Sequence, residues 1–441
     1  PFLFPNSNRS RRVAALAALA IAFAYRLGFG LCSEFWSSRD NEQIYLLGLK
    51  FYTTRLWPYF GPDVTQTIQI PGALQGLLVG LPFFVAPVPE APFILVSLLS
   101  FASLSFFAWY CCRRFPKLPK WLVWSWLLTL PWTLNVSTTI FNPSYVLPAG
   151  IVFFVVVLEL YPFTTMGLIP AAICNVMMAA AMTWTMQLHL SWVLLVPYAA
   201  LALYFQLRRR QFSSLLWFIV GAVVPATLLL PTFFKFGFPA GMGNTGGTVQ
   251  MNLHNVLAAL NPVEGVLPRF LSFASYEIPR FIGNNMTTRI AFLKANPWLI
   301  PFAIFLTVLG IAQPIHLIWQ WFANRSSRAD WRPIKFLTIA TVVWLCVAFL
   351  FSMKLPAAHT FYLMMPMALL YALYAWERLL VKSTWQRFAA AAIACSIIFH
   401  AGVALRNFRT TSIYADRDRI VEALEKKDFR IVGERPAGAK Y

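Results

Sequence analysis

The chain has 441 residues, of which 59% are hydrophobic and only 12% are charged. Soluble domains are roughly half apolar and about a quarter charged, so this composition excludes a soluble globular enzyme and a disordered chain. The net charge of +20 lies in short clusters between apolar runs, which is typical of cytoplasmic membrane loops and not of a nucleic-acid-binding surface. The sequence therefore predicts a polytopic membrane protein without a nucleic-acid partner.

The first apolar run, about 13–32, is long enough to cross a bilayer, which requires about 20 residues. Because three arginines at 9–12 precede it, we expect the N-terminus in the cytoplasm. The polar, Trp- and Tyr-rich stretch of about 33–70 is then the first external loop. The run 71–90 is apolar but short and is interrupted by Gly and Pro, so we expect a re-entrant or interfacial segment that does not cross.

Ten further spans are expected in the rest of the chain. They lie near 93–112, 121–139, 146–162, 168–186, 190–207, 213–231, 298–322, 333–352, 357–376 and 387–404. Cation clusters at 113–120, 208–210, 325–335 and 378–387 alternate with them and indicate the cytoplasmic side. The predicted fold is an all-α bundle of about 11–12 transmembrane spans with external juxtamembrane helices.

Two regions outside the bundle stand out. A stretch of about 232–297 forms a long external loop. The predicted transmembrane domain ends near 404, and 405–441 reads as a small external tail. Within that tail, Ile420, Val421 and Leu424 share one helical face, which indicates a helix lying against the protein surface.

Three polar stretches are expected to meet on the external side. Their candidate side chains are Asp40 and Glu42 in the first, Asn142, Gln187 and His189 in the second, and Lys354, His359 and Tyr362 in the third. A carboxylate can take the proton of an attacking nucleophile. Cations and a histidine can hold a phosphate leaving group. Such a combination favours group transfer from a phosphate-bearing donor.

The first of these stretches resembles the first external loop of GT-C glycosyltransferases. Trp36 precedes the acidic residues, and Tyr45-Leu46-Leu47 and Trp57-Pro58-Tyr59 follow them. In the third stretch, Lys354-Leu355-Pro356 with His359 and Tyr362 is similar to a Lys-Leu-Pro-His-Tyr segment. That segment occurs in the branch of bacterial protein O-mannosyltransferases and lipid A aminoarabinose transferases. Arg26, late in the first span, also fits this pattern.

The resemblance implies an inverting membrane glycosyltransferase. It would move a sugar from a polyprenyl-phosphate donor to an acceptor at the periplasmic face of a bacterial inner membrane. The acceptor is a protein, a lipid or a glycan, which the sequence leaves open. The N-terminus would be cytoplasmic and the C-terminus periplasmic.

The resemblance also assigns roles to residues. Asp40 or Glu42 would be the general base, and Lys354, His359 and Arg26 would bind the donor phosphate. Further substrate contacts are expected from Asp63, Asn142, Gln187, His189 and Tyr362. No cofactor is required. Some relatives hold a divalent metal, Mg or Mn, between two loop carboxylates, but Asn41 separates the acidic pair here and argues against it.

Each assignment has a structural alternative. Asp40 and Gln43 could form a capping box, and Lys354 and His359 could mark only the outer boundary of a span. Arg26 could pair with Glu34 or Asp40. Asp40 and Glu42 cannot both face one substrate, because residues two apart on a helix point about 200° apart.

Two other functions stay open at this point. The same polar residues could line the pathway of a transporter or flippase for a lipid-linked or hydrophobic solute. The chain could also be a catalytically inactive GT-C-like scaffold.

Overall fold

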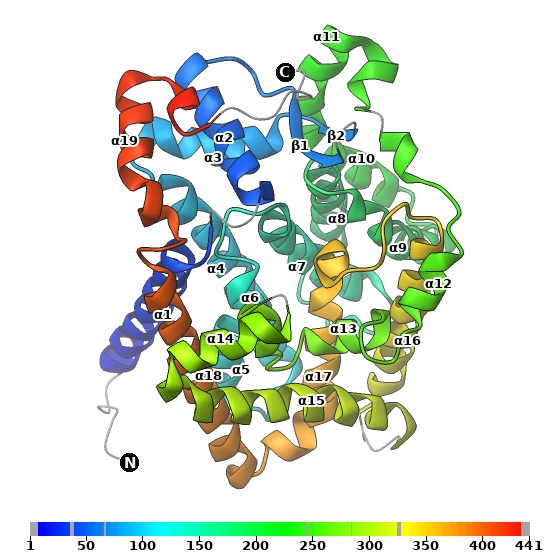
Figure 1. The fold of residues 1–441 in the computed structure, drawn as a ribbon. Coiled ribbons are helices and arrows are strands. Elements are labelled where there is room, and N and C mark those ends of the chain that lie inside the picture. Colours follow the sequence, from blue (N-terminus) through cyan, green and yellow to red (C-terminus); the bar gives the residue numbers. More distant parts are fainter. Residues whose placement is uncertain are drawn as a thin grey trace.

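The computed structural model describes residues 8–35, 39–65, 68–243, 245–283, 285–323 and 328–433. Trp36 and Arg325, and the side chains of Arg9 and Arg11, lie outside the described part. The described chain is almost entirely helical, as predicted (Figure 1).

Eight helical stretches among the described residues are long and apolar enough to cross a membrane. They comprise α1 (Asn8–Cys32), α4 (Ala91–Arg114), α7 (Asn142–Leu160), η1 with α9 (Leu190–Leu195 and Val196–Arg208), α10, η2 and α11 (Ser213–Ala226, Thr227–Leu229 and Leu230–Gly241), η5 with α15 (Pro297–Leu299 and Ile300–Ala323), α16 (Trp331–Leu350) and α18 (Ser383–Asn407). The chain is therefore an integral membrane protein of the all-α class.

The other three expected spans are helical but shorter. They are α5 and α6 (Lys120–Thr129 and Pro131–Asn135), α8 (Ala171–Met186), and η6 with α17 (Ala358–Met364 and Met365–Leu380). Each expected run is thus occupied by helix. The structure therefore has fewer membrane-length helices than the predicted eleven or twelve. Pro131 breaks the first of these three runs, and the regular α-helices of the other two runs, α8 and α17, are only 16 residues long.

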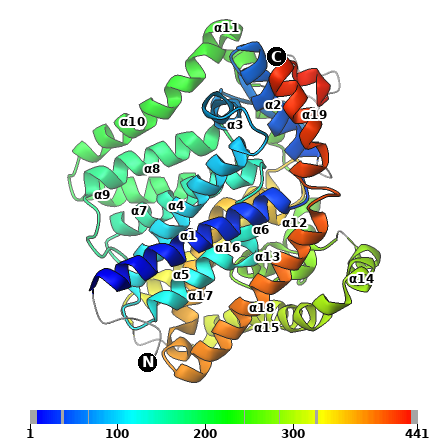
Figure 2. The ribbon, with the colours of Figure 1, turned by 90° about the vertical axis from the view of Figure 1, so that its left-hand side faces the viewer.

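The segment 71–90 contains α3 (Leu74–Val85), whose 12 residues are too few to span a bilayer. Figure 2 shows α3 end-on where α1 and α4 run lengthwise, so α3 lies across the direction of the long helices. Together with α2 (Arg39–Thr54), it forms a layer at one end of the bundle (Figures 1 and 2).

A small hairpin in the first external loop was not predicted. β1 (Phe60–Thr65) pairs antiparallel with β2 (Ile68–Pro71), with Asp63 opposite Gln69. Gly61 and Pro62, which precede Asp63, are residues typical of a turn and give no strand signal. The pairing fixes Asp63, whose Oδ1 accepts a hydrogen bond of 3.0 Å from Nε2 of Gln69.

The long external loop is also structured. It contains η3 (Thr245–Thr248), α12 (His254–Ala259), α13 (Val266–Ser272), η4 (Ile278–Phe281) and α14 (Met286–Ala295). The Gly-rich stretch 241–247 of this loop includes the start of η3, and Asn244 lies outside the described residues.

The C-terminal tail folds into η7 (Ile413–Asp416), α19 (Arg417–Lys426) and η8 (Phe429–Ile431). Ile420 and Leu424 are buried, while Val421 is half-buried. An ion pair of 3.0 Å between Arg417 and Glu90 ties α19 to the start of α4. The tail therefore packs on the same end of the bundle as α2 (Figure 1).

At the opposite end, several predicted cytoplasmic helix ends share one charged cluster. Arg114 at the end of α4 contacts Asp330 (3.1 Å), which directly precedes α16. Arg328 bridges Asp330 (3.0 Å) and Glu377 of α17 (3.4 Å). Glu159, near the end of α7, lies 3.9 Å from Arg114. These contacts hold the four helices in register.

Arg26 of α1 binds backbone carbonyls on both sides of the break between α5 and α6. The Arg26 guanidinium is fully buried and donates to the carbonyls of Leu128 and Thr133, each at 2.8 Å. It also donates to Oγ of Ser137 at 2.7 Å. Arg26 thus binds neutral groups, in contrast to the predicted alternative of an ion pair with Glu34 or Asp40.

Tyr362 of η6 completes this arrangement. Its hydroxyl donates to the carbonyl of Trp132 in α6 at 2.8 Å. Because an unsatisfied backbone group inside a membrane costs several kcal/mol, Arg26 and Tyr362 stabilise the broken helix.

We predict that Arg26→Gln lowers the free energy of unfolding by about 1–3 kcal/mol, because it leaves the buried carbonyl of Leu128 unpaired. Unfolding titrations and thermal melting in detergent measure this loss. Arg12→Gln, at an exposed position of the same helix, is the control and should change stability little. An Arg26→Gln protein as stable as this control would contradict the assigned structural role.

Candidate functional site

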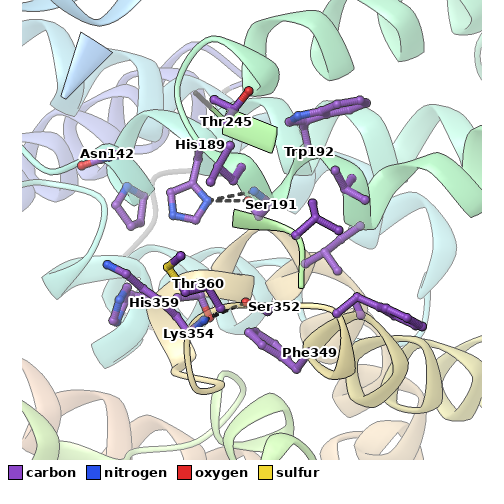
Figure 3. Close-up of a pocket in the computed structure, with 18 of the residues that line it drawn as sticks. Asn142, His189, Ser191, Trp192, Thr245, Phe349, Ser352, Lys354, His359 and Thr360 are labelled. Atoms are coloured by element: carbon purple, nitrogen blue, oxygen red, sulfur yellow. Dashed lines mark hydrogen bonds between the residues drawn. The ribbon is translucent and has the colours of Figure 1, made fainter. Parts of the chain in front are cut away.

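A cavity of about 540 Å³ opens where the predicted external ends of the helices meet. Six of the side chains selected from the sequence line it: Asp40, Asp63, Asn142, His189, Lys354 and His359. They come from α2, the hairpin, α7, the turn before η1, and the segment between α16 and α17. In Figure 3, His189 lies on one side of the space, and Lys354 and His359 lie on the other.

One wall of this cavity is apolar. It is formed by Trp192, Val193 and Leu194 of η1 and by Trp344, Ala348 and Phe349 of α16. A hydrogen bond of 3.1 Å from Nε1 of Trp344 to the carbonyl of Leu194 fixes the two helices together. The cavity therefore offers polar and charged groups to one part of a ligand and an apolar surface to another.

The structure distinguishes the two candidate general bases, Asp40 and Glu42. α2 begins at Arg39, so Asp40 lies within its first turn, where it lines the cavity. Glu42 does not line it. The Glu42 carboxylate instead lies beside Gly433 of the C-terminal tail, 3.6 Å from where a Cβ atom on Gly433 would stand. Of these two carboxylates, Asp40 is therefore the one that faces the cavity.

His189 is held in one orientation by Ser191. The backbone N–H of Ser191 donates to Nδ1 of His189 at 3.1 Å, and the Ser191 hydroxyl lies 2.8 Å from the same nitrogen (Figure 3). Because Nδ1 accepts, the proton of the neutral ring is on Nε2. Burial lowers the pKa of His189 to about 3, and the charges of His359 and Lys354 act in the same direction. His189 is thus a neutral hydrogen-bond donor.

The segment that carries Lys354 is fixed by the long external loop. Nδ2 of the fully buried Asn255 donates to the carbonyls of Phe349, Ser352 and Lys354 at 2.9, 2.7 and 3.1 Å. Arg269 donates to the carbonyl of Pro356. Asn255 and Arg269 therefore set the backbone from which Lys354 and His359 project.

Four other candidates lie outside the cavity lining. Arg26 and Tyr362 stabilise the broken helix, and Glu42 faces the tail. Gln187 is fully buried, and its Nε2 donates to the carbonyl of Pro225 at 2.7 Å. The sequence placed these residues on the correct element but gave no information on which way each side chain points.

Two supporting residues were missed by the sequence analysis. Ser191 follows His189 at a spacing that permits a side-chain cap, which was a usable signal. Asn255 lies in an apolar helical stretch, and nothing in its neighbourhood indicates that it contacts a segment about a hundred residues away. Within the described residues, no group of three or more His, Cys, Asp or Glu side chains is arranged to hold a metal ion.

No protein-family model matches the chain, and no curated protein matches it significantly. Among solved structures, it is similar to the crystal structure of ArnT from Cupriavidus metallidurans bound to undecaprenyl phosphate, with a TM-score of 0.51 at 12% sequence identity. The match covers 95% of this chain and 76% of ArnT. The chain therefore has the fold of ArnT, in agreement with the GT-C-like architecture expected from the sequence.

We predict that Asn255→Leu accelerates amide hydrogen exchange in residues 350–356 by about tenfold or more, because three carbonyls lose their shared donor. Exchange measured by mass spectrometry tests this. His254→Leu, at the exposed neighbouring position, should leave the rate in this segment unchanged. Equal rates in both variants would contradict the assignment.

The pKa of His189 predicts a pH effect on stability. In the unfolded chain, His189 titrates near its usual 6.5, whereas the folded state keeps the ring neutral down to about 3. The contribution of His189 to stability is therefore complete above its pKa in the unfolded chain. It is lost as the pH falls toward the lower pKa of the folded state. Between about pH 7 and about pH 4.5, the wild type should lose more thermal stability than His189→Gln. His254→Gln should follow the wild type; an equal loss in His189→Gln would refute the prediction.

Proposed function

We propose that this chain, which has the fold of ArnT, is a GT-C-type membrane glycosyltransferase that moves a sugar from a polyprenyl-phosphate donor to an acceptor. The reaction would take place on the periplasmic side of a bacterial inner membrane, with the N-terminus in the cytoplasm. The loop motifs that resemble GT-C enzymes support the same assignment.

The observation that carries this proposal is the amphipathic cavity. Polar and charged side chains from five separate segments meet beside an apolar wall built by η1 and α16. A polyprenyl phosphate has the same two parts, a charged headgroup and an apolar chain. In this proposal, the headgroup occupies the polar part and the first isoprene units lie along Trp344 and Phe349.

Lys354, His359 and His189 would hold the phosphate. The Lys354 ammonium supplies positive charge, which stabilises the phosphate as it leaves. Neutral His189 would donate from Nε2 to a phosphate or sugar oxygen. Arg26 is left out of this group because its guanidinium is already bound to the broken helix.

Asp40 would act as the general base. Its carboxylate takes the proton from an acceptor hydroxyl or amine, and the acceptor atom forms a bond to the anomeric carbon. The bond from that carbon to the phosphate oxygen breaks, and the lipid phosphate departs with its electron pair. A single displacement of this kind inverts the anomeric configuration.

The arrangement does not favour a metal bridging the acidic pair. Asp40 and Glu42 face different parts of the molecule, and the residue between them is Asn41. In this proposal, Lys354 provides the positive charge that a bound metal would otherwise supply.

We predict that Asp40→Asn lowers sugar transfer by about 100-fold or more, because it removes the base without changing the size of the side chain. Glu42→Gln is the matched control and should keep most of the activity. The assay uses purified protein in vesicles, a radiolabelled polyprenyl-phosphate sugar and a membrane extract as the acceptor source.

Equal activity in Asp40→Asn and the wild type would refute the proposed base. If the wild type transfers no sugar from any donor but moves the labelled lipid between leaflets, the transporter alternative is correct. If it does neither, the scaffold alternative is correct.

A further inference from the structure

The short helix α12 of the long external loop has two very different faces. The residues that flank it, Leu253 and Leu260, have the same right-handed helical backbone. Leu253, Leu257 and Leu260 are therefore spaced as i, i+4 and i+7 and lie on one face. Their side chains are 66%, 73% and 67% exposed, whereas Asn255 and Ala259 on the opposite face are buried. The apolar face of α12 thus points away from the protein.

The buried face of α12 is attached to the segment that carries Lys354. Asn255 donates to three backbone carbonyls of that segment. Just before α12, the backbone N–H of Asn252 donates to the carbonyl of Leu350 at 2.8 Å. Because these hydrogen bonds join the two segments directly, the position of α12 determines the position of the Lys354 backbone.

The exposed face of α12 continues a surface that faces lipid. α16 is long and apolar enough to cross a membrane. Phe336, Val343 and Val347 share one face of this helix, and all three are exposed. Beyond the end of α16, Val249 pairs with Ser352 in an antiparallel bridge. Figure 1 shows α12 at the edge of the molecule, beside α16. The apolar surface of the span therefore extends onto the loop.

The sequence around α12 carries no charged side chain. Residues 236–263 contain no Asp, Glu, Lys or Arg. Further apolar side chains of this stretch are exposed, namely those of Val249, Met251 and Val263. Large exposed apolar patches are rare on surfaces that face water, whereas a helix at a membrane boundary buries its apolar face among acyl chains. Lipid therefore matches this surface better than a charged protein partner does.

We propose that α12 is an interfacial anchor whose apolar face inserts into the leaflet at this end of the bundle. Leu253, Leu257 and Leu260 contact the acyl chains, and the bilayer thereby holds Asn255 against the Lys354 segment. The bilayer then orders part of the first cavity in addition to surrounding the spans. This inference goes beyond the proposed function, because it holds whether or not the chain transfers a sugar.

Photolabelling of the wild-type chain in vesicles tests the insertion. The vesicles consist of phosphatidylcholine with a small fraction of the same lipid carrying a diazirine on one acyl chain, and labelled residues are located by mass spectrometry. We expect α12 to be labelled as strongly as the exposed face of α16 and about tenfold more than α19. α19 is the matched control, because it also lies outside the bundle but its exposed residues include Glu422, Glu425 and Lys426.

A pair of variants tests the link to the Lys354 segment. Leu257→Glu places a charge on the apolar face, whereas Leu257→Phe keeps that face apolar. In vesicles, we expect Leu257→Glu to abolish the labelling of α12 and to accelerate amide hydrogen exchange in residues 350–356 by about fivefold or more. Leu257→Phe should match the wild type in both measurements. Exchange in α4 reports on the overall fold and should be unchanged in both variants.

Three results would overturn the inference. The first is labelling of α12 no stronger than that of α19, which requires no variant. The second is cross-linking of α12 between two copies of the chain in place of lipid adducts. The third is a Leu257→Glu protein that loses labelling without faster exchange in residues 350–356. If Leu257→Glu also accelerates exchange in α4, the milder Leu257→Ser decides by the same criteria. Sugar transfer enters none of these measurements, so their failure leaves the proposed function intact.

Discussion

The central physical constraint in this fold is the satisfaction of backbone carbonyls at a break inside a membrane helix. Pro131 separates α5 from α6, and the buried carbonyls beside this break have no water to bind within a bilayer. Arg26 reaches them from α1, and Tyr362 reaches the neighbouring Trp132 from η6. A charged side chain is expensive at this depth, and its hydrogen bonds to the broken helix are what offset that cost.

This constraint also positions the candidate site. α6 leads directly to Phe141 and Asn142, which lie at the wall of the cavity, and η6 carries His359 three residues before Tyr362. α1 is followed in the chain by α2, whose first turn carries Asp40. The three elements that meet at the break, α1, α6 and η6, therefore position three parts of the site. Asn255 fixes the backbone of Lys354 independently of them. At the other end, the cluster around Arg114 keeps α4, α7, α16 and α17 aligned.

Much of this could be predicted from the sequence, because lipid forces a simple pattern on composition. Apolar runs and cation clusters located every helix of the bundle and grouped Asp40, His189, Lys354 and His359 at one end. The β1–β2 hairpin was missed because Gly61 and Pro62 suggest a turn. Arg26 and Tyr362 were assigned to phosphate and substrate binding because of their residue types. A residue type does not show in which direction its side chain points. Tertiary packing decides which of Asp40 and Glu42 faces the cavity, and no local sequence pattern shows this. The same holds for the contact of Asn255 with the Lys354 backbone.

The central claim is that the polar part of the first cavity binds the phosphate of a lipid-linked donor. The most direct measurement is a structure of the full chain in a lipid nanodisc with a bound polyprenyl phosphate. The account predicts the phosphate within hydrogen-bonding distance of the Lys354 ammonium and the His189 Nε2, with the isoprene chain along Trp344 and Phe349. A phosphate bound outside the first cavity, for example at Arg26, with the first cavity empty, would contradict it.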